Sequence, residues 1–345
     1  MKRISALISA AFLSSTAAFA GEIEDSLRAG FDQGTLNGLH GVLVQRGDDT
    51  LAEIYFQGPD ERWGMPLGDR QFGPDELHDL RSVSKSIVSL LYGIALDKGL
   101  VPPPDAPLLA QFPKHADLSD PKRDAITIED VLTMLLGLEW NENLPYTDPR
   151  NSEIAMEQAP DKVRFILSRP IVAPPGTQWV YSGGATALLG ELIGRGSGQS
   201  LDQFAQTHLF APLGITQVDW VPGLDGRASA ASGLRLTARD LARIGQMIAN
   251  SGTFDGKQIV PSDWLVQSLT AHADTAGPLR YGYHWWLAPE GTPPVWAAGL
   301  GNGGQQLSIG RETGTIIVIQ AGNYNKPDGW RLPVTVINSY IAPNL

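Results

Sequence analysis

The sequence predicts an α/β (α+β) fold in which one sheet is built from both ends of the chain and a mainly helical region is inserted between them. Two observations carry this prediction. Alternating β-rich runs lie at residues 41–58 and again from about residue 294 onward, whereas residues 100–225 look mainly helical with long loops. A sheet must bury a face against other elements, so flanking helices are expected. We place the sheet domain at residues 21–80 plus 226–345 and the helical region at residues 81–225.

The first twenty residues are typical of a secretory signal. Lys2 and Arg3 precede a short apolar stretch that ends in Ala18-Phe19-Ala20, the small-x-small pattern of a cleavage site. The alternative is a membrane anchor, but the stretch is short for a span and serines dilute it. We expect cleavage after Ala20, a periplasmic or secreted protein, and no membrane span in the mature chain.

The remaining elements follow from local patterns. Residues 41–58 hold two β-rich runs around Gly47-Asp48-Asp49, which predicts a hairpin. Residues 82–98 lack proline and are apolar on most faces, and Gly99 follows as a stop, which predicts a buried helix. Later helices are expected from Ile128 onward, at residues 185–194, at residues 201–209 and at residues 236–250, where Thr237 is the expected N-cap. From about residue 294 we expect three strands, followed by a packed helix at the C-terminus.

Composition excludes several classes of protein. Hydrophobic residues make up 42% and charged residues 18% of the chain, which indicates a globular protein with its own core. The absence of cysteine excludes a thiol nucleophile and disulfide support. A net charge of −11 argues against nucleic acid or an anionic membrane as the main partner.

Ser82 and Lys85 are the first candidates for chemistry. Residues three apart share one face of a helix, so the hydroxyl and the amine can meet. Lys85 could activate the serine if burial and nearby cations lowered its pKa. The alternative is that Lys85 pairs with a carboxylate and Ser82 merely caps the helix. The same spacing recurs at Ser119 and Lys122, but Pro121 lies between them and indicates a loop.

Tyr181 and a glycine-rich loop are the next candidates. Small residues follow Tyr181, so its phenol can face a cavity, and a nearby lysine cation would favour the ionised form, which can act as a general base. The alternative is a core tyrosine. Residues 299–305 contain four glycines, which permit close approach to a ligand or form a plain turn. We count Gly301, Asn302 and Gln305 of this loop as candidate oxyanion or substrate residues.

Other chemistries find no support in the sequence. There is no Gly-x-Ser-x-Gly elbow, no His-Glu-x-x-His motif and no paired metal spacing among the six histidines. We therefore expect no metal and no organic cofactor. His284, which lies in an aromatic run, is interpreted as a packing residue near a cleft.

Taken together and in order, the motifs resemble the β-lactamase-related serine hydrolases of the penicillin-binding fold. They are most similar to the branch that contains class C β-lactamases, certain esterases and 6-aminohexanoate-dimer hydrolase. The similar stretches include LRSVSKSIVSLLYGIALDKGL, PGTQWVYSGGATALLGELI and YGYHWWL. The resemblance implies an antiparallel sheet and an acyl-enzyme mechanism. In it Ser82 attacks, Lys85 and Tyr181 share the proton traffic, and the amides of Ser82 and Gly301 form the oxyanion hole. Tyr146 resembles a substrate-side tyrosine.

Two departures from the family pattern narrow the expected function. The Tyr-x-Asn motif reads Tyr181-Ser182-Gly183, and the Lys-Thr-Gly triad aligns with Ala298-Gly299-Leu300, so the cation that binds substrate carboxylates is missing. We expect a hydrolase of a small-molecule ester or amide. The alternatives are a β-lactamase or D,D-peptidase, and a non-catalytic binding or sensor module of the same fold. Labelling of Ser82 and a substrate panel separate the three.

Overall fold

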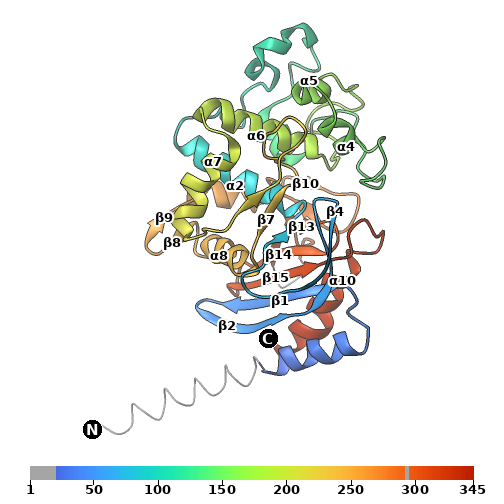
Figure 1. Cartoon of the computed structure of the whole chain (residues 1–345). Coiled ribbons are helices and arrows are strands. Elements are labelled where there is room, and N and C mark those ends of the chain that lie inside the picture. Colours follow the sequence, from blue (N-terminus) through green and yellow to red (C-terminus); the bar gives the residue numbers. More distant parts are fainter. Residues whose placement is uncertain (1–20, 292–294) are drawn as a thin grey trace, which may run out of the picture.

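An eight-stranded antiparallel sheet forms the centre of the molecule (Figure 1). The structure is a computed structural model that describes residues 21–291 and 295–345, so the predicted signal at residues 1–20 lies outside the described residues. The strands run in the order β10-β11-β12-β13-β14-β15-β1-β2. Their bounds are β1 (Leu39–Arg46), β2 (Asp49–Tyr55), β10 (Ala273–Asp274), β11 (Arg280–Tyr281), β12 (Trp286–Leu287), β13 (Trp296–Gly301), β14 (Gln305–Gly310) and β15 (Thr315–Ala321).

The order of the strands confirms the predicted fold class. The hairpin β1–β2 comes from the N-terminal part of the chain and pairs through β1 with β15 from the C-terminal part. The central strands are buried on both faces, because their side chains alternate between two cores. Val42 and Val44 of β1 belong to one core and Leu43 to the other.

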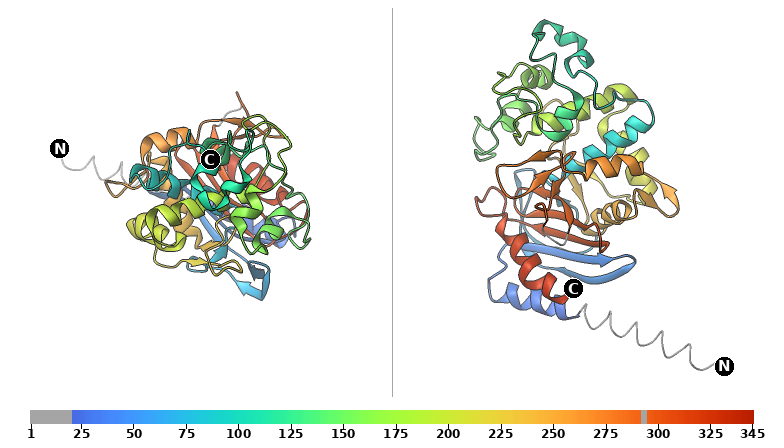
Figure 2. Two further views of the ribbon diagram at one scale, coloured as in Figure 1. Left: turned by 90° about the horizontal axis from the view of Figure 1, so that it is seen from above. Right: turned by 180° about the vertical axis from the view of Figure 1, so that it is seen from behind.

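Two helical layers cover the two faces of the sheet. The outer layer consists of helical residues 21–32 together with α10 (Arg331–Thr335) and the π-helical segment Val336–Ile341, which confirms the predicted terminal helix. The inner layer contains α2 (Val83–Asp97) and α8 (Ala238–Ala249), and most of the other helices lie on the side of α2 away from the sheet (Figure 2). Their bounds are α3 (Ile128–Thr133), α4 (Ser152–Glu157), α5 (Lys162–Leu167), α6 (Gly183–Ser197), α7 (Leu201–Ala205) and α9 (Ser262–Ser268).

The local sequence sets the ends of these helices. α8 begins where Thr237 accepts a hydrogen bond of 3.0 Å from the amide of Asp240, as predicted. α3 ends after one and a half turns because Met134 adopts a left-handed φ of 61°. The helix expected at residues 201–209 changes at Gln206 from α to π geometry. Among the described residues, no helix has both the length and the apolar character needed to span a bilayer.

Three small sheets complete the described structure. β3 (Gln57–Arg62) pairs with β4 (Met65–Gln71), and β8 (Thr253–Phe254) pairs with β9 (Lys257–Gln258). The third sheet has the order β5-β7-β6, from β5 (His78–Asp79), β6 (Asp219–Trp220) and β7 (Leu234–Leu236). β5 lies directly before the helix α2 and therefore fixes the approach of the chain to Ser82. The domain boundaries at residues 80 and 226 stay a prediction.

Candidate active site

Ser82 lies at the N-terminal end of α2, directly after a residue with a strained backbone. Arg81 has a φ of 48°, in the left-handed region that residues other than glycine rarely adopt. Its guanidinium contacts the carboxylates of Asp79, at 3.1 Å, and Glu61, and lies 4.6 Å from the ring centroid of Tyr324. These buried contacts hold Arg81 in place and thereby set the direction of Ser82.

Lys85 connects the serine to an acidic residue. Its ammonium donates hydrogen bonds of 3.0 Å to Ser82 Oγ, 3.1 Å to Glu153 Oε2 and 3.1 Å to the carbonyl of Ala231. All three protons of the ammonium are thus used, and only 1% of the residue is exposed. One part of the alternative interpretation, the pairing of Lys85 with a carboxylate, is therefore confirmed. The other part, a Ser82 that merely caps the helix, is wrong, because the Ser82 side chain makes no capping hydrogen bond to α2.

The charges around Lys85 differ from those expected. Burial lowers the pKa of Lys85, but the negative charge of Glu153, together with Tyr181 and Glu142, more than offsets it and raises the pKa above its ordinary value. The condition under which Lys85 would activate the serine, a pKa lowered by burial and nearby cations, is therefore not met, because carboxylates surround the ammonium. In the free protein Lys85 is a cation.

Tyr181 lies beside Lys85, as predicted. The ammonium of Lys85 is 5.0 Å from the centroid of the tyrosine ring. The next residue, Ser182, caps α6 by accepting a hydrogen bond of 3.3 Å from the amide of Ala185. Burial raises the pKa of Tyr181, and the cation of Lys85 only partly opposes this effect. The phenol is therefore neutral in the free protein, contrary to the expected ionisation.

Tyr146 reaches the same site through a second acidic residue, Glu142. The hydroxyl of Tyr146 donates a hydrogen bond of 3.1 Å to Glu142 Oε2. Glu142 Oε1 accepts a bond of 2.6 Å from the indole of Trp140 and a further bond from the amide of Gly183. Burial, reinforced by the charge of Glu153, raises the pKa of Glu142. Glu142 lies only four residues before Tyr146, but nothing in the sequence indicated this role.

The strand β13 runs against the first turns of α2. A Cβ at Gly299 would lie 3.1 Å from Ser86 Oγ, and a Cβ at Gly301 would lie 2.4 Å from the carbonyl oxygen of Leu80. The two glycines thus allow the strand to pass close to both sides of Ser82. Leu300 lies between these two points of contact.

The backbone register of β13 corrects the expected oxyanion donor. The carbonyl of Trp296 accepts a hydrogen bond from Ala288 on the β12 side, and that of Gly301 accepts one from Gly304 on the β14 side. The N–H and C=O of one residue point to the same side of a strand, and the side alternates along it. The N–H of Gly301 therefore faces β14. The N–H of Leu300 faces the edge that β12 leaves open beyond residue 298.

Asn302 and Gln305 support the loop after β13. The side chain of Asn302 accepts a hydrogen bond of 2.9 Å from the amide of Asn325. The buried amide of Gln305 binds both backbone groups of Ala321, accepting from its N–H at 3.2 Å and donating to its carbonyl. The polar atoms of the Gln305 side chain are therefore already bound to the backbone. This differs from the expectation that Gln305 contributes to the oxyanion or substrate site.

Aromatic rings line the site beside Tyr181. The ring of Trp286 lies 5.6 Å from that of Tyr181, 5.5 Å from Trp179 and 5.2 Å from Tyr281, measured between centroids. Trp286 also pairs across the sheet with Ala298, which is fully buried. β13 carries no charged side chain at all. Sequence reasoning did not single out these rings, and their convergence depends on the register of β12.

His284 packs against α2. Its backbone carbonyl accepts a hydrogen bond of 2.7 Å from Ser86 Oγ, and its Nδ1 lies 2.9 Å from the carbonyl of Leu132. Burial lowers the pKa of His284 to about 4. These contacts agree with the interpretation of His284 as a packing residue.

One group of described side chains has the donor types of a metal site. The donor atoms of His40, Asp60 and His78 lie within 4.8 Å of one another. His78 Nδ1 binds the carbonyl of Asp79, so His78 Nε2 accepts the proton of His40 Nδ1 at 2.9 Å. Arg235 also lies 3.8 Å from Asp60. The donors thus satisfy one another beside a cation, which fits a hydrogen-bonded pair better than a metal ligand set.

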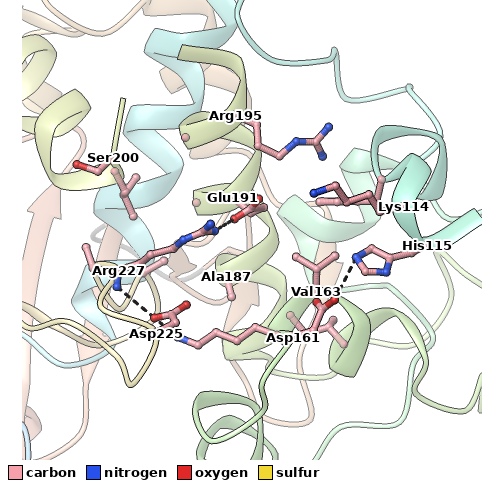
Figure 3. Close-up of a pocket in the computed structure, with 18 of the residues that line it drawn as sticks. Lys114, His115, Asp161, Val163, Ala187, Glu191, Arg195, Ser200, Asp225 and Arg227 are labelled. Carbon is pink, nitrogen blue, oxygen red and sulfur yellow. Dashed lines mark hydrogen bonds and ion pairs between the residues drawn. The ribbon is translucent and has the colours of Figure 1, made fainter. Parts of the chain in front are cut away.

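A groove of about 850 Å³ lies elsewhere, between α5, α6 and the loop before β7 (Figure 3). Charged residues line it, and several pair with one another, such as Arg227 with Glu191. Ser82, Lys85 and Tyr181 do not line this groove. We place the candidate site at Ser82 because its hydroxyl, the ammonium of Lys85 and the ring of Tyr181 come together there.

The fold is that of the β-lactamase and transpeptidase class. A profile of the beta-lactamase family matches residues 28–329. The chain belongs to the beta-lactamase family.

Two of the relatives that the chain resembles are a dimer hydrolase and an esterase. The chain is 27% identical over 311 residues to the 6-aminohexanoate-dimer hydrolase of Paenarthrobacter ureafaciens, covering 83% of this chain and 73% of that protein. It is 26% identical over 224 residues to the lovastatin esterase of Penicillium rubens, covering 58% of this chain and about half, 53%, of that protein.

Solved structures share the fold at low identity. A penicillin-binding protein homologue from Caulobacter crescentus superposes with a TM-score of 0.70 at 17% identity, covering 95% of this chain and 98% of that chain. The hydrolase EstCE1, which has promiscuous acyltransferase activity, superposes with a TM-score of 0.74 at 16% identity, covering 95% and 99%.

Proposed function

We propose that this protein is a serine hydrolase that cleaves a small, uncharged ester or amide through an acyl-enzyme. The observation that carries the proposal is the hydrogen bond of 3.0 Å from Lys85 to a Ser82 hydroxyl that is free of any capping role. The open edge of β13 at Leu300 lies beside this hydroxyl. The two curated relatives, an amide hydrolase and an esterase, support the same class of reaction.

The reaction begins when Ser82 Oγ attacks the carbonyl carbon of the substrate. The serine proton passes to Tyr181 or Lys85, whichever is unprotonated, and the N–H groups of Ser82 and Leu300 stabilise the oxyanion. Collapse of the intermediate breaks the ester or amide bond, and the stored proton goes to the leaving alcohol or amine. Water then attacks the acyl-enzyme by the same route and releases the acid and free Ser82.

The surroundings favour substrates without a carboxylate next to the scissile bond. Lys85 is neutralised by Glu153, and β13 offers no cation where a carboxylate would dock. The rings of Trp179, Tyr181 and Trp286 instead offer apolar surface for an acyl or alcohol group. This argues for simple esters and amides over β-lactams and peptidoglycan stems.

The proposed reaction takes place outside the cytoplasm. Residues 1–20 have the charge, apolar stretch and small residues of a cleavable secretory signal. The N-terminal mass of the protein recovered from the periplasm or culture medium tests this, with Gly21 as the expected first residue.

A fluorophosphonate probe tests the proposed nucleophile. Intact mass should show one adduct on the wild type and none on Ser82→Ala, with the adduct mapped to Ser82. Ser119→Ala, which removes the serine of the second Ser-x-x-Lys match, is the matched control and should label normally. Absence of labelling in the wild type would indicate a binding module. p-Nitrophenyl esters and short amides should turn over, and efficient hydrolysis of nitrocefin would instead identify a β-lactamase.

A further inference from the structure

The carboxylate of Glu153 occupies the space into which a side chain at residue 183 would project. A Cβ built on Gly183 would lie 2.3 Å from Glu153 Oε2, the same oxygen that accepts the hydrogen bond from Lys85. Any residue other than glycine here would therefore push the carboxylate away from the ammonium. The glycine in Tyr181-Ser182-Gly183, a departure from the family pattern, thus has a physical partner on another element.

The local structure of α4 holds this carboxylate in place. Asn151 caps the helix by accepting a hydrogen bond of 3.0 Å from the amide of Glu153, and its side chain amide donates one of 2.7 Å to the carbonyl of Leu144. Ser152 Oγ accepts a bond of 2.9 Å from the amide of Asn141. Glu153 itself is buried. The hydrogen bonds of Asn151 and Ser152 therefore hold the backbone of Glu153 in place independently of its contact with Lys85.

The other groups around the ammonium do not replace this charge. Ser82 and the carbonyl of Ala231 are neutral acceptors. Glu142 acts on Lys85 from the loop before α4, but its oxygens bind other partners. Tyr181 faces Lys85 from the start of α6, and His284 from the segment before β12. Only Glu153 makes a direct ion pair with Lys85 among the described residues.

We propose that Glu153 is a positioning residue for catalysis, which aims the ammonium of Lys85 at Ser82 and keeps it charged. The proposal rests on the proposed serine-hydrolase function. Glu153 acts through Lys85 and does not touch the reacting carbonyl. Its negative charge also opposes ionisation of Tyr181. Removal of this charge makes both candidate bases easier to deprotonate, since burial alone disfavours the charged form of Lys85.

The pH dependence of fluorophosphonate labelling tests the proposal without knowledge of the substrate. In the wild type the labelling rate rises with pH as the base loses its proton. We expect Glu153→Gln to move the midpoint of this rise to lower pH, by about one pH unit or more. Glu153→Asp keeps the charge and should restore the wild-type midpoint. A role confined to structure would lower the rate at every pH and leave the midpoint in place.

A matched control lies one turn away on the same helix. Glu157 is buried, and its ion-pair partner is Lys162, at 2.7 Å, whereas that of Glu153 is Lys85. Glu157→Gln should leave the midpoint unchanged. Gly183→Ala is the second test, because its Cβ displaces the carboxylate while every charged residue remains, and it should also shift the midpoint downward.

The outcomes separate the two proposals. No labelling of wild-type Ser82 overturns the proposed function. Labelling of Ser82 with an unchanged midpoint in Glu153→Gln overturns the role of Glu153 alone, and so does an equal shift in Glu157→Gln. If Glu153→Gln does not fold, the midpoint of Gly183→Ala decides in the same way.

Discussion

The Cβ that Gly299 lacks would lie 3.1 Å from Ser86 Oγ, so β13 presses against the nucleophile helix one turn after Ser82. Leu300 follows, with its N–H on the open edge of the strand, and Gly301 then passes the carbonyl of Leu80. The strand can approach this closely only because glycine occupies both positions that face the helix. The backbone of Leu300, and not its side chain, is therefore the group that the proposed reaction uses.

Leu300→Pro should remove the second oxyanion donor and leave the pairing of β13 with β14 intact. The lost N–H faces the open edge, so no ladder bond to β14 depends on it. We expect kcat for a p-nitrophenyl ester to fall about 10²- to 10³-fold, the usual effect of losing one oxyanion-hole donor. Leu300→Ala keeps the N–H and is the control, with activity near that of the wild type. Equal losses in both variants would assign the effect to the side chain.

The rate of hydrolysis should rise toward alkaline pH. The pKa of Lys85 is raised, chiefly by Glu153 against the effect of burial, and the pKa of Tyr181 is raised by burial. Whichever group accepts the serine proton, its unprotonated form is scarce at neutral pH. That form increases about tenfold per pH unit below the pKa, so kcat/KM should increase with the same slope. The measurement is kcat/KM from pH 6 to 9, and a maximum near pH 6 would contradict the shifts.

Most of the fold followed from local patterns in the sequence. The hairpin at residues 41–58, the buried helix α2 and the strands β13 to β15 are long enough for their periodicity to show. The strands β5, β10, β11 and β12 have two residues each, and two residues carry no periodicity. Their existence depends on pairing with partners far along the chain, so sequence reasoning missed them.

The site was predicted in part, for a related reason. The motif spacing brought Ser82, Lys85 and Tyr181 together correctly, because a helix and a family pattern define those positions. Glu153 lies on the short helix α4, which the sequence analysis did not predict, and only tertiary packing brings it to Lys85. The sequence therefore could not show that the charge of Glu153 raises the pKa of Lys85. Whether the N–H of Gly301 or that of Leu300 is the second oxyanion donor depends on the register of β13, which the glycine pattern alone does not determine.

Arg81→Ala should strongly destabilise the protein at neutral pH. The guanidinium pairs with the buried carboxylate of Asp79 and the half-buried one of Glu61, which would lose that partner. Breaking a buried pair from one side costs about 3–5 kcal/mol of unfolding free energy. Burial raises the pKa of both carboxyls, so in the folded state they bind protons more readily than in the unfolded state. Their protonation therefore favours folding as the pH falls.

Chemical denaturation at pH 8 and pH 5 measures this effect. The deficit of Arg81→Ala relative to the wild type should be smaller at pH 5. Arg150→Ala, which breaks an exposed pair with Asp148, is the control and should change stability little at either pH. A deficit that is the same at both pH values would show that packing against Tyr324, and not charge, is what the guanidinium supplies.

The buried pair of His40 and His78 should make the fold sensitive to acid. Burial lowers the pKa of both residues to about 3, against 6.5 for an ordinary histidine. A group with a depressed pKa in the folded state supports folding above its unfolded pKa, and the support is lost as the pH falls toward the folded value. Between pH 6.5 and 3 each histidine should lower the unfolding free energy by about 1.4 kcal/mol per pH unit. His284 adds a third such group.

Denaturation midpoints and slopes from pH 8 to pH 5 test this linkage. In His40→Gln the slope of the unfolding free energy against pH should become smaller by the contribution of one histidine, about 1.4 kcal/mol per pH unit. The same variant at pH 8, above the unfolded pKa, isolates the loss of packing against Phe72, whose ring lies 4.1 Å from that of His40. An unchanged slope would mean that His40 and His78 accept a proton without unfolding. The pair would then tolerate protonation in the folded state, and the loss of the hydrogen bonds that its neutral rings make would not be what makes the fold sensitive to acid.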